Sequence, residues 1–191
     1  MAAKTARIAD STSKEASSVP GLCLGAVLRH GKADALNQRI DGKWQAISAE
    51  QFAERVKNVA LGLAAAGIRP GDRIALLSEN RPDWSIAGLA ILGLGAINVP
   101  IYTTQAVDQI DFILSDSGAK TIFISNKRLY KHALPALTNR QLDHVIFFDS
   151  ETAEGIDRAI SLDQLEQKGK DHAAERPDAL DAYQRAVRAD D

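Results

Sequence analysis

The sequence predicts an α/β protein: a mostly parallel sheet with helices on both faces, preceded by a β-hairpin. Three units repeat one order, a helix, a glycine and a short β-branched run, with Gly67, Gly95 and Gly118 spaced 28 and 23 residues apart. The β-branched runs are continuously apolar, as is typical of strands buried in a parallel sheet. With 191 residues, 45% of them hydrophobic and 25% charged, the chain is long enough for such a core.

The first 17 residues are rich in Ala, Ser, Thr and Lys and have no hydrophobic period, which predicts a disordered arm. No apolar run follows their basic residues, so the pattern matches neither a secretion signal nor a membrane anchor. We therefore expect a cytoplasmic protein, and peripheral association with a membrane stays open.

A β-hairpin is expected over residues 35–47. Asp41 and Gly42 stand between two alternating segments there, and this dipeptide tolerates the positive φ of a type I′ turn.

A helix is expected to follow, because Ser48 and Gln51 have the spacing of a capping box. Its apolar positions share one helical face: Phe52, Val56, Val59, Ala60 and Leu63. Gly67 is a natural residue to end this helix, since glycine reaches the left-handed region without a Cβ penalty.

Four strands are then predicted, at residues 73–78, 97–102, 121–125 and 144–149, the last after a helix that ends near Asn139. The apolar run from Ile86 to Ile101 is too short and too interrupted for a membrane span, which needs about 20 residues. It indicates a buried helix followed by a buried strand. Pro100 fits only at a strand end or a sheet edge.

The strand pattern lapses from Glu151 onward. Ser161 and Gln164 again have capping-box spacing, so we expect a short helix that ends at Gly169, and at most one more helix over residues 177–187. Residues 151–191 hold eleven acidic and six basic side chains. The expected organisation is a disordered arm at 1–17, an α/β subdomain at 18–150 and an acidic helical connector at 151–191 that leads to a missing remainder.

Composition excludes several classes of function. A formal net charge of −2 gives no basic excess for nucleic acid. Cys23 is the only cysteine, so no intrachain disulfide can form. The four histidines are scattered along the chain rather than clustered, so we expect no metal site: His30, His132, His144 and His172.

Candidate ligand-binding residues follow the strands, because open parallel sheets bind ligands beyond the carboxyl ends of their strands. They are Ser78, Glu79 and Asn80, then Tyr102, Thr103 and Thr104, then Ser125 and Asn126. Helix capping is the simpler role, by Asn80 or Ser125 and by Thr103 or Thr104. The acids Glu79, Asp83, Asp108 and Asp111 are expected to be isolated surface residues.

The sequence offers little support for a small flavodoxin-like nucleotide binder, which is one alternative. Gly93 and Gly95 resemble half of a dinucleotide fingerprint, but they lie between a helix and the next strand. A phosphate loop needs the opposite order, so that helix-terminal N–H groups point at the anion. No P-loop, serine-centred elbow or convincing carboxylate pair is present.

A recognisable set of residues runs through and around Ile68 to Tyr102: Gly67, Gly71, Asp72, Asn80, Asp83-Trp84, Gly95-Ala96 and Val99-Pro100. With these residues the segment resembles the opening domain of the AMP-forming (adenylate-forming) acyl-CoA synthetases. The resemblance extends back to residues 41–44 and forward through 113–120, and Pro100 to Thr104 resembles the long-chain fatty-acid branch.

The resemblance implies a parent enzyme that joins a fatty acid to CoA, with ATP converted to AMP and pyrophosphate. ATP, Mg²⁺ and CoA would serve the full-length parent, and the family's phosphate loop would lie beyond Asp191. No catalytic, cofactor-binding or metal-binding residue can therefore be placed on this chain, and we expect it to be inactive alone. A non-catalytic dimerisation or interaction module is the second alternative.

Overall fold

The computed structural model describes residues 18–40, 42–138 and 140–179. The expected arm at 1–17 and most of the expected helix at 177–187 lie outside these ranges. The helices are α1 (Val19–His30), α2 (Ala49–Ala65), α3 (Pro82–Gly93), α4 (Val107–Ser117), α5 (Lys127–Leu137), the short 3₁₀ helix η1 (Ser150–Ala153) and α6 (Leu162–Glu175). The strands are β1 (Leu36–Ile40), β2 (Lys43–Ile47), β3 (Arg73–Leu77), β4 (Ile97–Ile101), β5 (Thr121–Ile124), β6 (His144–Phe147) and β7 (Ala159–Ser161).

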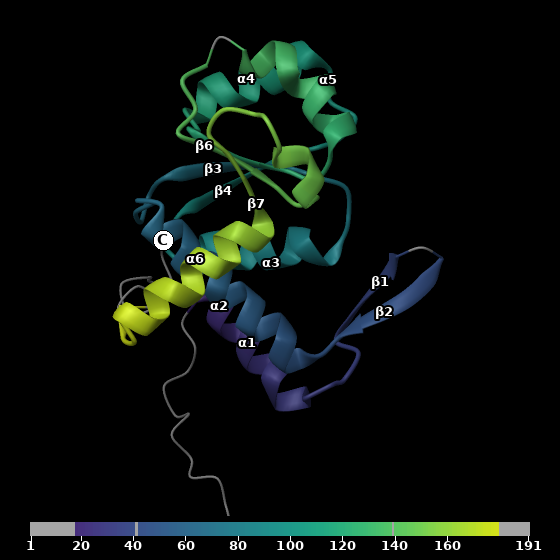
Figure 1. Ribbon diagram of the computed structural model, residues 1–191, viewed down its shortest axis with the longest axis vertical. Helices are drawn as coiled ribbons and strands as arrows, with labels where there is room; N and C mark the ends of the chain where they lie inside the picture. Colours follow the sequence, from purple (N-terminus) through teal and green to yellow (C-terminus); the bar gives the residue numbers. More distant parts are fainter. Residues whose placement is uncertain (1–17, 41, 139, 180–191) are drawn as a thin grey trace, which may run out of the picture.

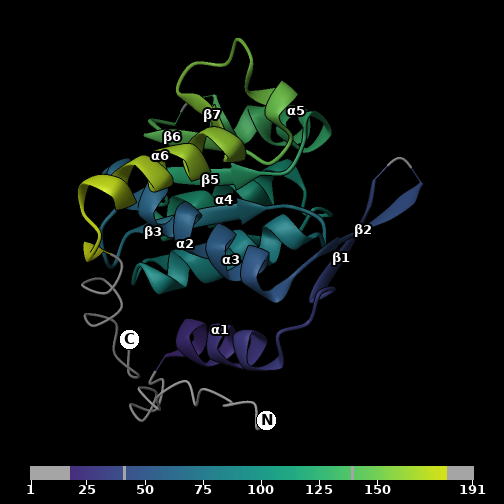
Figure 2. The ribbon, with the colours of Figure 1, turned by 60° about the horizontal axis from the view of Figure 1, so that its bottom comes forward.

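The predicted fold class is confirmed. Five parallel strands form one sheet in the order β4-β3-β5-β6-β7. Helices α2, α3 and α6 cover one face, α4 and α5 cover the other, and α1 packs outside α2 and α3 (Figures 1 and 2). Each face of the sheet has its own apolar cluster, as a two-sided parallel sheet requires.

The predicted hairpin is also confirmed. Strands β1 and β2 pair antiparallel with Ile40 opposite Lys43, and Gly42 has the expected positive φ of 77°. The ribbon extends away from the body of the molecule (Figure 1), and both strands are largely exposed.

Helix α2 begins and ends as predicted. The Gln51 N–H donates to Ser48 Oγ at 3.2 Å, and the Ser48 N–H donates to Gln51 Oε1 at 2.9 Å. At the other end Gly67 has a φ of 92°, and the Gly67 and Ile68 N–H groups donate to the carbonyls of Ala64 and Leu63. These two bonds form a Schellman motif.

The apolar run at 86–101 forms α3 and β4, but β4 is not the buried strand that we expected. It lies at the edge of the sheet, and Ile97 is 49% exposed. The Ile97 N–H donates to the backbone carbonyl of Asp72, toward the inside of the sheet. Successive residues of a strand direct their backbone groups to opposite sides, so the backbone nitrogen of residue 100 faces the open edge. Pro100 therefore removes a donor from the open edge, which protects it against pairing. Across the described ranges, no helix is long and apolar enough to cross a membrane.

The sheet continues past Glu151, where we expected the strand pattern to lapse. Strand β7 pairs parallel to β6, and its three residues are too few to show a period in the sequence. The Ser161 capping box is confirmed, but α6 does not end at Gly169 and continues to Glu175. Gly169 is instead a contact point, because an added Cβ there would lie 1.8 Å from the carbonyl oxygen of Asn58 in α2.

Helix α1 was not predicted. Ser18 caps it by accepting a hydrogen bond from the Gly21 N–H at 3.4 Å, Pro20 lies in its first turn, and Gly31 ends it with a φ of 53°. Proline at the start and glycine at the end are ordinary helix signals, so the sequence contained the boundary information.

Candidate functional site

The strand order reverses at β3, which places a switch point between β3 and β5. The chain leaves β3 for β4 on one side and returns to β5 on the other. Ligands of doubly wound sheets bind in the crevice beyond the carboxyl ends of such strands. Ser78, Glu79, Ser125 and Asn126, which the sequence nominated because they follow these two strands, lie there.

Glu79 bridges this crevice. Its carboxylate accepts hydrogen bonds from Ser125 Oγ and, at 2.8 Å, from Asn126 Nδ2. Asn126 Oδ1 in turn accepts the Leu129 N–H at 3.0 Å, which caps α5. Ser125 is fully buried, so the loops after β3 and β5 are fastened together by side chains that the sequence nominated for ligand binding.

The bridge carries negative charge at neutral pH. Partial burial alone would raise the pKa of Glu79, but the hydrogen bond from Ser125, a backbone hydrogen bond and the nearby charges of Arg81 and Arg128 together lower it. The carboxylate form is thus favoured, and a phosphate group in this crevice would meet a like charge.

Two predicted caps in these loops are wrong. Asn126 rather than Ser125 caps α5. The N-cap of α3 is Arg81 rather than Asn80, and it makes no side-chain capping bond.

The predicted cap of α4 by Thr103 or Thr104 is also wrong. The helix begins after Ala106, whose N–H donates to Gln109 Oε1 at 3.0 Å. Tyr102, the other candidate after β4, is 76% exposed.

Asp83 is not the isolated surface acid that we expected. It is 5% exposed, and its two oxygens accept from Arg55 at 2.9 Å and Arg81 at 2.8 Å. Arg55 also pairs with Glu166 at 2.8 Å, and Arg81 pairs with Asp149 at 2.8 Å. The result is a run of alternating charges from α6 through α2 and α3 to the end of β6, which we call the charge network.

Burial and pairing act in opposite directions on the pKa values of the charge network. Burial alone would lower the pKa of Arg55, but Glu166 and Asp83 raise it overall, and Asp149 and Asp83 do the same for Arg81. The pKa of Glu166 is raised, because burial, with smaller repulsion from Asp163 and Asp83, outweighs its pairing with Arg55. Burial therefore destabilises the charged form of Glu166 more than the interaction with Arg55 stabilises it.

The charge network joins elements that lie far apart in the sequence. Arg81 also lies over the ring of Phe148, 5.6 Å from its centroid. Its members hold one another, and together they fix the amino end of α3 against α2, α6 and the end of β6. Sequence spacing could not reveal this arrangement, since Arg55 and Glu166 are far apart along the chain.

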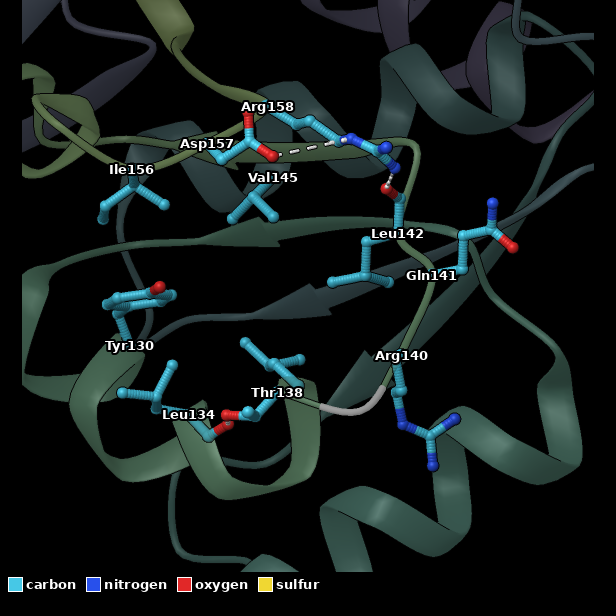
Figure 3. A pocket seen from close by; sticks show the side chains of 11 residues that line it. Tyr130, Leu134, Thr138, Arg140, Gln141, Leu142, Val145, Ile156, Asp157 and Arg158 are labelled. Atoms are coloured by element: carbon cyan, nitrogen blue, oxygen red, sulfur yellow. Dashed lines mark hydrogen bonds and ion pairs between the residues drawn. The ribbon is translucent and has the colours of Figure 1, made fainter.

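A pocket of ≈ 510 Å³ lies at the opposite, amino end of β6, between α5 and the segment that leads to β7 (Figure 3). Leu134, Leu142, Val145 and Ile156 contribute apolar surface to it. Both of its arginines are held by the protein: Arg158 Nη1 donates to the carbonyl of Leu142 at 2.9 Å, and Arg140 Nη2 donates to Asp111 Oδ1 at 2.6 Å.

A second hollow, of ≈ 700 Å³, lies beside the switch point. Lys127 and Arg128 at the start of α5 line it together with Asp149, Glu151 and Glu154, so it has no consistent charge. Among the residues that the structure describes, no group of three or more His, Cys, Asp or Glu side chains is arranged to hold a metal ion.

Known proteins share both the sequence pattern and the fold of this chain. The family model described as "AMP-binding enzyme" matches residues 25–185. The long-chain-fatty-acid–CoA ligase FadD15 of Mycobacterium bovis is 39% identical over 84 residues, which are 44% of this chain and 14% of that protein. A feruloyl-CoA synthase of Amycolatopsis is 39% identical over 77 residues, 40% of this chain and 16% of that protein.

Among solved structures, the acetoacetyl-CoA synthetase of Streptomyces lividans has the same fold. Its TM-score is 0.67 at 17% identity, and the match covers 78% of this chain and 25% of that one. The matched region spans between about a seventh and a quarter of the length of these three proteins. The chain therefore belongs to the AMP-binding enzyme family and corresponds to an amino-terminal portion of the acyl-CoA synthetases within it.

Proposed function

We propose that the chain is part of a long-chain fatty-acid–CoA ligase, and that it supplies scaffold rather than reactive groups. In the whole enzyme a fatty acid and ATP would give acyl-AMP and pyrophosphate, and CoA would then form the thioester. The match of the family model to residues 25–185 is the observation that carries this proposal.

The loops at the carboxyl edge support a scaffold role. The three loops that lead from β3, β4 and β5 into helices, residues 78–81, 102–106 and 125–126, contain no glycine. A phosphate loop needs glycine so that the backbone N–H groups can approach the anion. Acyl-adenylate formation places charge on a phosphate that preorganised donors and cations must stabilise, and here Glu79 occupies the switch point.

ATP, Mg²⁺ and CoA would accordingly be bound by parts of the enzyme other than these loops. The acyl class rests on the mycobacterial relative and on the segment from Pro100 to Thr104, which resembles the long-chain branch. The feruloyl-CoA synthase is equally identical over a similar length, so sequence identity alone does not distinguish a fatty acid from an aromatic acid as the substrate. The preference for a long-chain fatty acid is therefore a separate proposal.

Two assays test the proposal. ATP–pyrophosphate exchange by the 191-residue chain with palmitate should stay at background, and clear palmitate-dependent exchange would refute its inactivity. The second assay tests whether the chain serves as part of an acyl-CoA ligase. A chimera is made in which this chain replaces the matching segment of the mycobacterial relative, and its activity is compared with palmitate and with ferulate as substrates. A folded chimera that uses neither acid counts against that role, and preference for ferulate overturns the long-chain assignment.

The strand order also favours a second candidate, a flavodoxin-like nucleotide binder. The order β4-β3-β5-β6-β7 is the flavodoxin order 2-1-3-4-5, in which FMN binds at the switch point. Titration of the chain with FMN and with AMP discriminates the two functions. Micromolar binding that Glu79→Gln strengthens would favour the nucleotide binder.

A further inference from the structure

Helix α1 is apolar on two sides. Its inner side places Pro20, Leu24 and Val27 against the core. Its outer side exposes Val19 to 61% and Leu22 to 57%. A helix that is apolar all round is normally buried on every side, so the outer side of α1 has the character of a contact surface.

The outer residues share one face of the helix, and Ala26 is the half-buried member among them. Val19, Leu22, Cys23 and Ala26 have the spacing i, i+3, i+4, i+7, which places them on one face of a helix. Cys23 is exposed as well. We call these four residues the outer stripe of α1.

Positive charge accompanies the outer stripe. Arg29 and His30 are exposed in the last turn of α1, Lys32 is exposed just beyond it, and α1 itself contains no acid. Residues 1–47 hold seven Lys and Arg against four Asp and Glu, a net +3, whereas residues 48–191 hold 16 against 21, a net −5. The apolar stripe thus belongs to the basic part of an acidic chain.

The hairpin adds an amphipathic aromatic residue close to α1 in sequence. Trp44 is 71% exposed, and Arg39 lies opposite it on the neighbouring strand. Only residues 31–35 connect α1 to this hairpin (Figure 2). Tryptophan beside basic residues is typical of surfaces that meet the boundary between lipid and water.

We propose that the outer stripe of α1, with its basic end, docks on an anionic lipid surface. Such a surface offers an apolar layer for Val19 and Leu22 and negative charge for Arg29 and Lys32 at once. A second copy of the chain would cover the stripe but would bring the same unmatched basic residues with it. The proposal concerns binding alone and does not depend on the ligase activity proposed above.

Flotation of the 191-residue chain with lipid vesicles tests the proposal. Vesicles of phosphatidylcholine with one quarter phosphatidylglycerol should carry the chain, and pure phosphatidylcholine should not. Raising NaCl from about 0.1 M to about 1 M should release it, because the screening length falls from about 10 Å to about 3 Å. Equal binding to both kinds of vesicle, or none to either, overturns the proposal.

Matched variants assign the surface. The double variant Val19→Ser/Leu22→Ser should weaken partitioning about tenfold, since two exposed apolar side chains lose their transfer into lipid. Arg29→Gln/Lys32→Gln should weaken it by a similar factor at low salt. The controls lie on the helices of the opposite sheet face: Phe112→Ser, where Phe112 is 67% exposed, and Lys127→Gln/Lys131→Gln should both stay within about twofold of the parent.

Each remaining outcome decides the question. Equal losses in the α1 variants and in the controls would show that α1 is not the docking surface. If the parent is dimeric by light scattering, becomes monomeric on Leu22→Ser and never floats, the outer stripe is a contact between copies and the lipid proposal is wrong.

Discussion

Replacing Gly169 with alanine should destabilise the fold, although alanine is the better helix former. The substitution places a Cβ 1.8 Å from the Asn58 carbonyl oxygen and 2.9 Å from the Gly62 nitrogen, both of them backbone atoms of α2. Ordinary van der Waals contact begins near 3.4 Å. Helices α2 and α6 would therefore have to move apart by about 1.6 Å at the closest pair of atoms.

The magnitude follows from two opposing effects. Overpacking a well-packed contact costs about 1–3 kcal/mol, and a clash of a Cβ with backbone atoms, which cannot rotate away, belongs at the upper end of that range. Replacing glycine by alanine inside a helix returns about 1 kcal/mol. We expect the free energy of unfolding to fall by about 2 kcal/mol, or the Tm by about 4–8 °C for a chain of this length.

Urea unfolding followed by far-UV circular dichroism measures this difference, and Gly88→Ala is the matched control. Gly88 also lies inside a buried helix, but its nearest neighbour for a Cβ is the side-chain amide of Asn98 at 3.6 Å. Gly88→Ala should be neutral or stabilising by up to about 1 kcal/mol. If the two variants had equal stability, the close backbone contact between α2 and α6 would be refuted.

The same contact predicts non-additivity. A Cβ at Gly62 would lie 2.2 Å from the Leu165 carbonyl oxygen, so Gly62→Ala should also destabilise. Once the helices have separated for one methyl group, the second meets less resistance. The double variant Gly62→Ala/Gly169→Ala should therefore lose clearly less than the sum of the single losses.

Three further predictions concern carboxylates that are paired or hydrogen-bonded in the fold. Asp83→Ala should lower the free energy of unfolding by about 3 kcal/mol in urea denaturation, because two half-buried arginines would each lose a partner. The control is Asp111→Ala, at an exposed ion pair, which should lower it by less than about 1 kcal/mol. Since the pKa of Glu79 is lowered in the fold, the contribution of its carboxylate to stability should be lost as pH falls through that pKa. At pH 7 the parent should be more stable than Glu79→Gln by about 1 kcal/mol, and thermal melts run toward pH 3 should show this difference shrinking. Since the pKa of Glu166 is raised, the opposite sign holds. The parent should lose stability relative to Glu166→Gln as pH rises from the ordinary pKa of a glutamate toward the raised one, and parallel stability curves would contradict the raised pKa.

Sequence reasoning succeeded where local signals and the long-range arrangement agree. The Asp-Gly hairpin, the capping box at Ser48 and the apolar strands are all local, and the topological rules for parallel sheets then leave few arrangements. It failed where a glycine served a tertiary contact. Gly169 was interpreted as a helix end because glycine commonly ends helices, and only the position of α2 shows why the helix continues through it.

The site was located in sequence, but its chemistry was not. The rule for open sheets placed Ser78, Glu79, Ser125 and Asn126 at one edge, and the structure brings them together. The charge network was missed, because Asp83 finds Arg55 across 28 residues and Glu166 lies a further 83 residues along the chain. No hydrophobic period or short motif records a contact of that kind.

The switch point shows why strand order is insufficient to assign function. By order alone, this sheet would be expected to hold a nucleotide between β3 and β5. A phosphate needs N–H donors free to approach it and a field that favours negative charge. Here the hydroxyl of Ser125 and the amide of Asn126 already donate to Glu79, whose lowered pKa keeps it negatively charged. A nucleotide could bind in this crevice only if that charge were removed. Glu79→Gln would remove the repulsion and keep the shape, which makes it the variant that separates a blocked nucleotide crevice from a scaffold that holds two loops together.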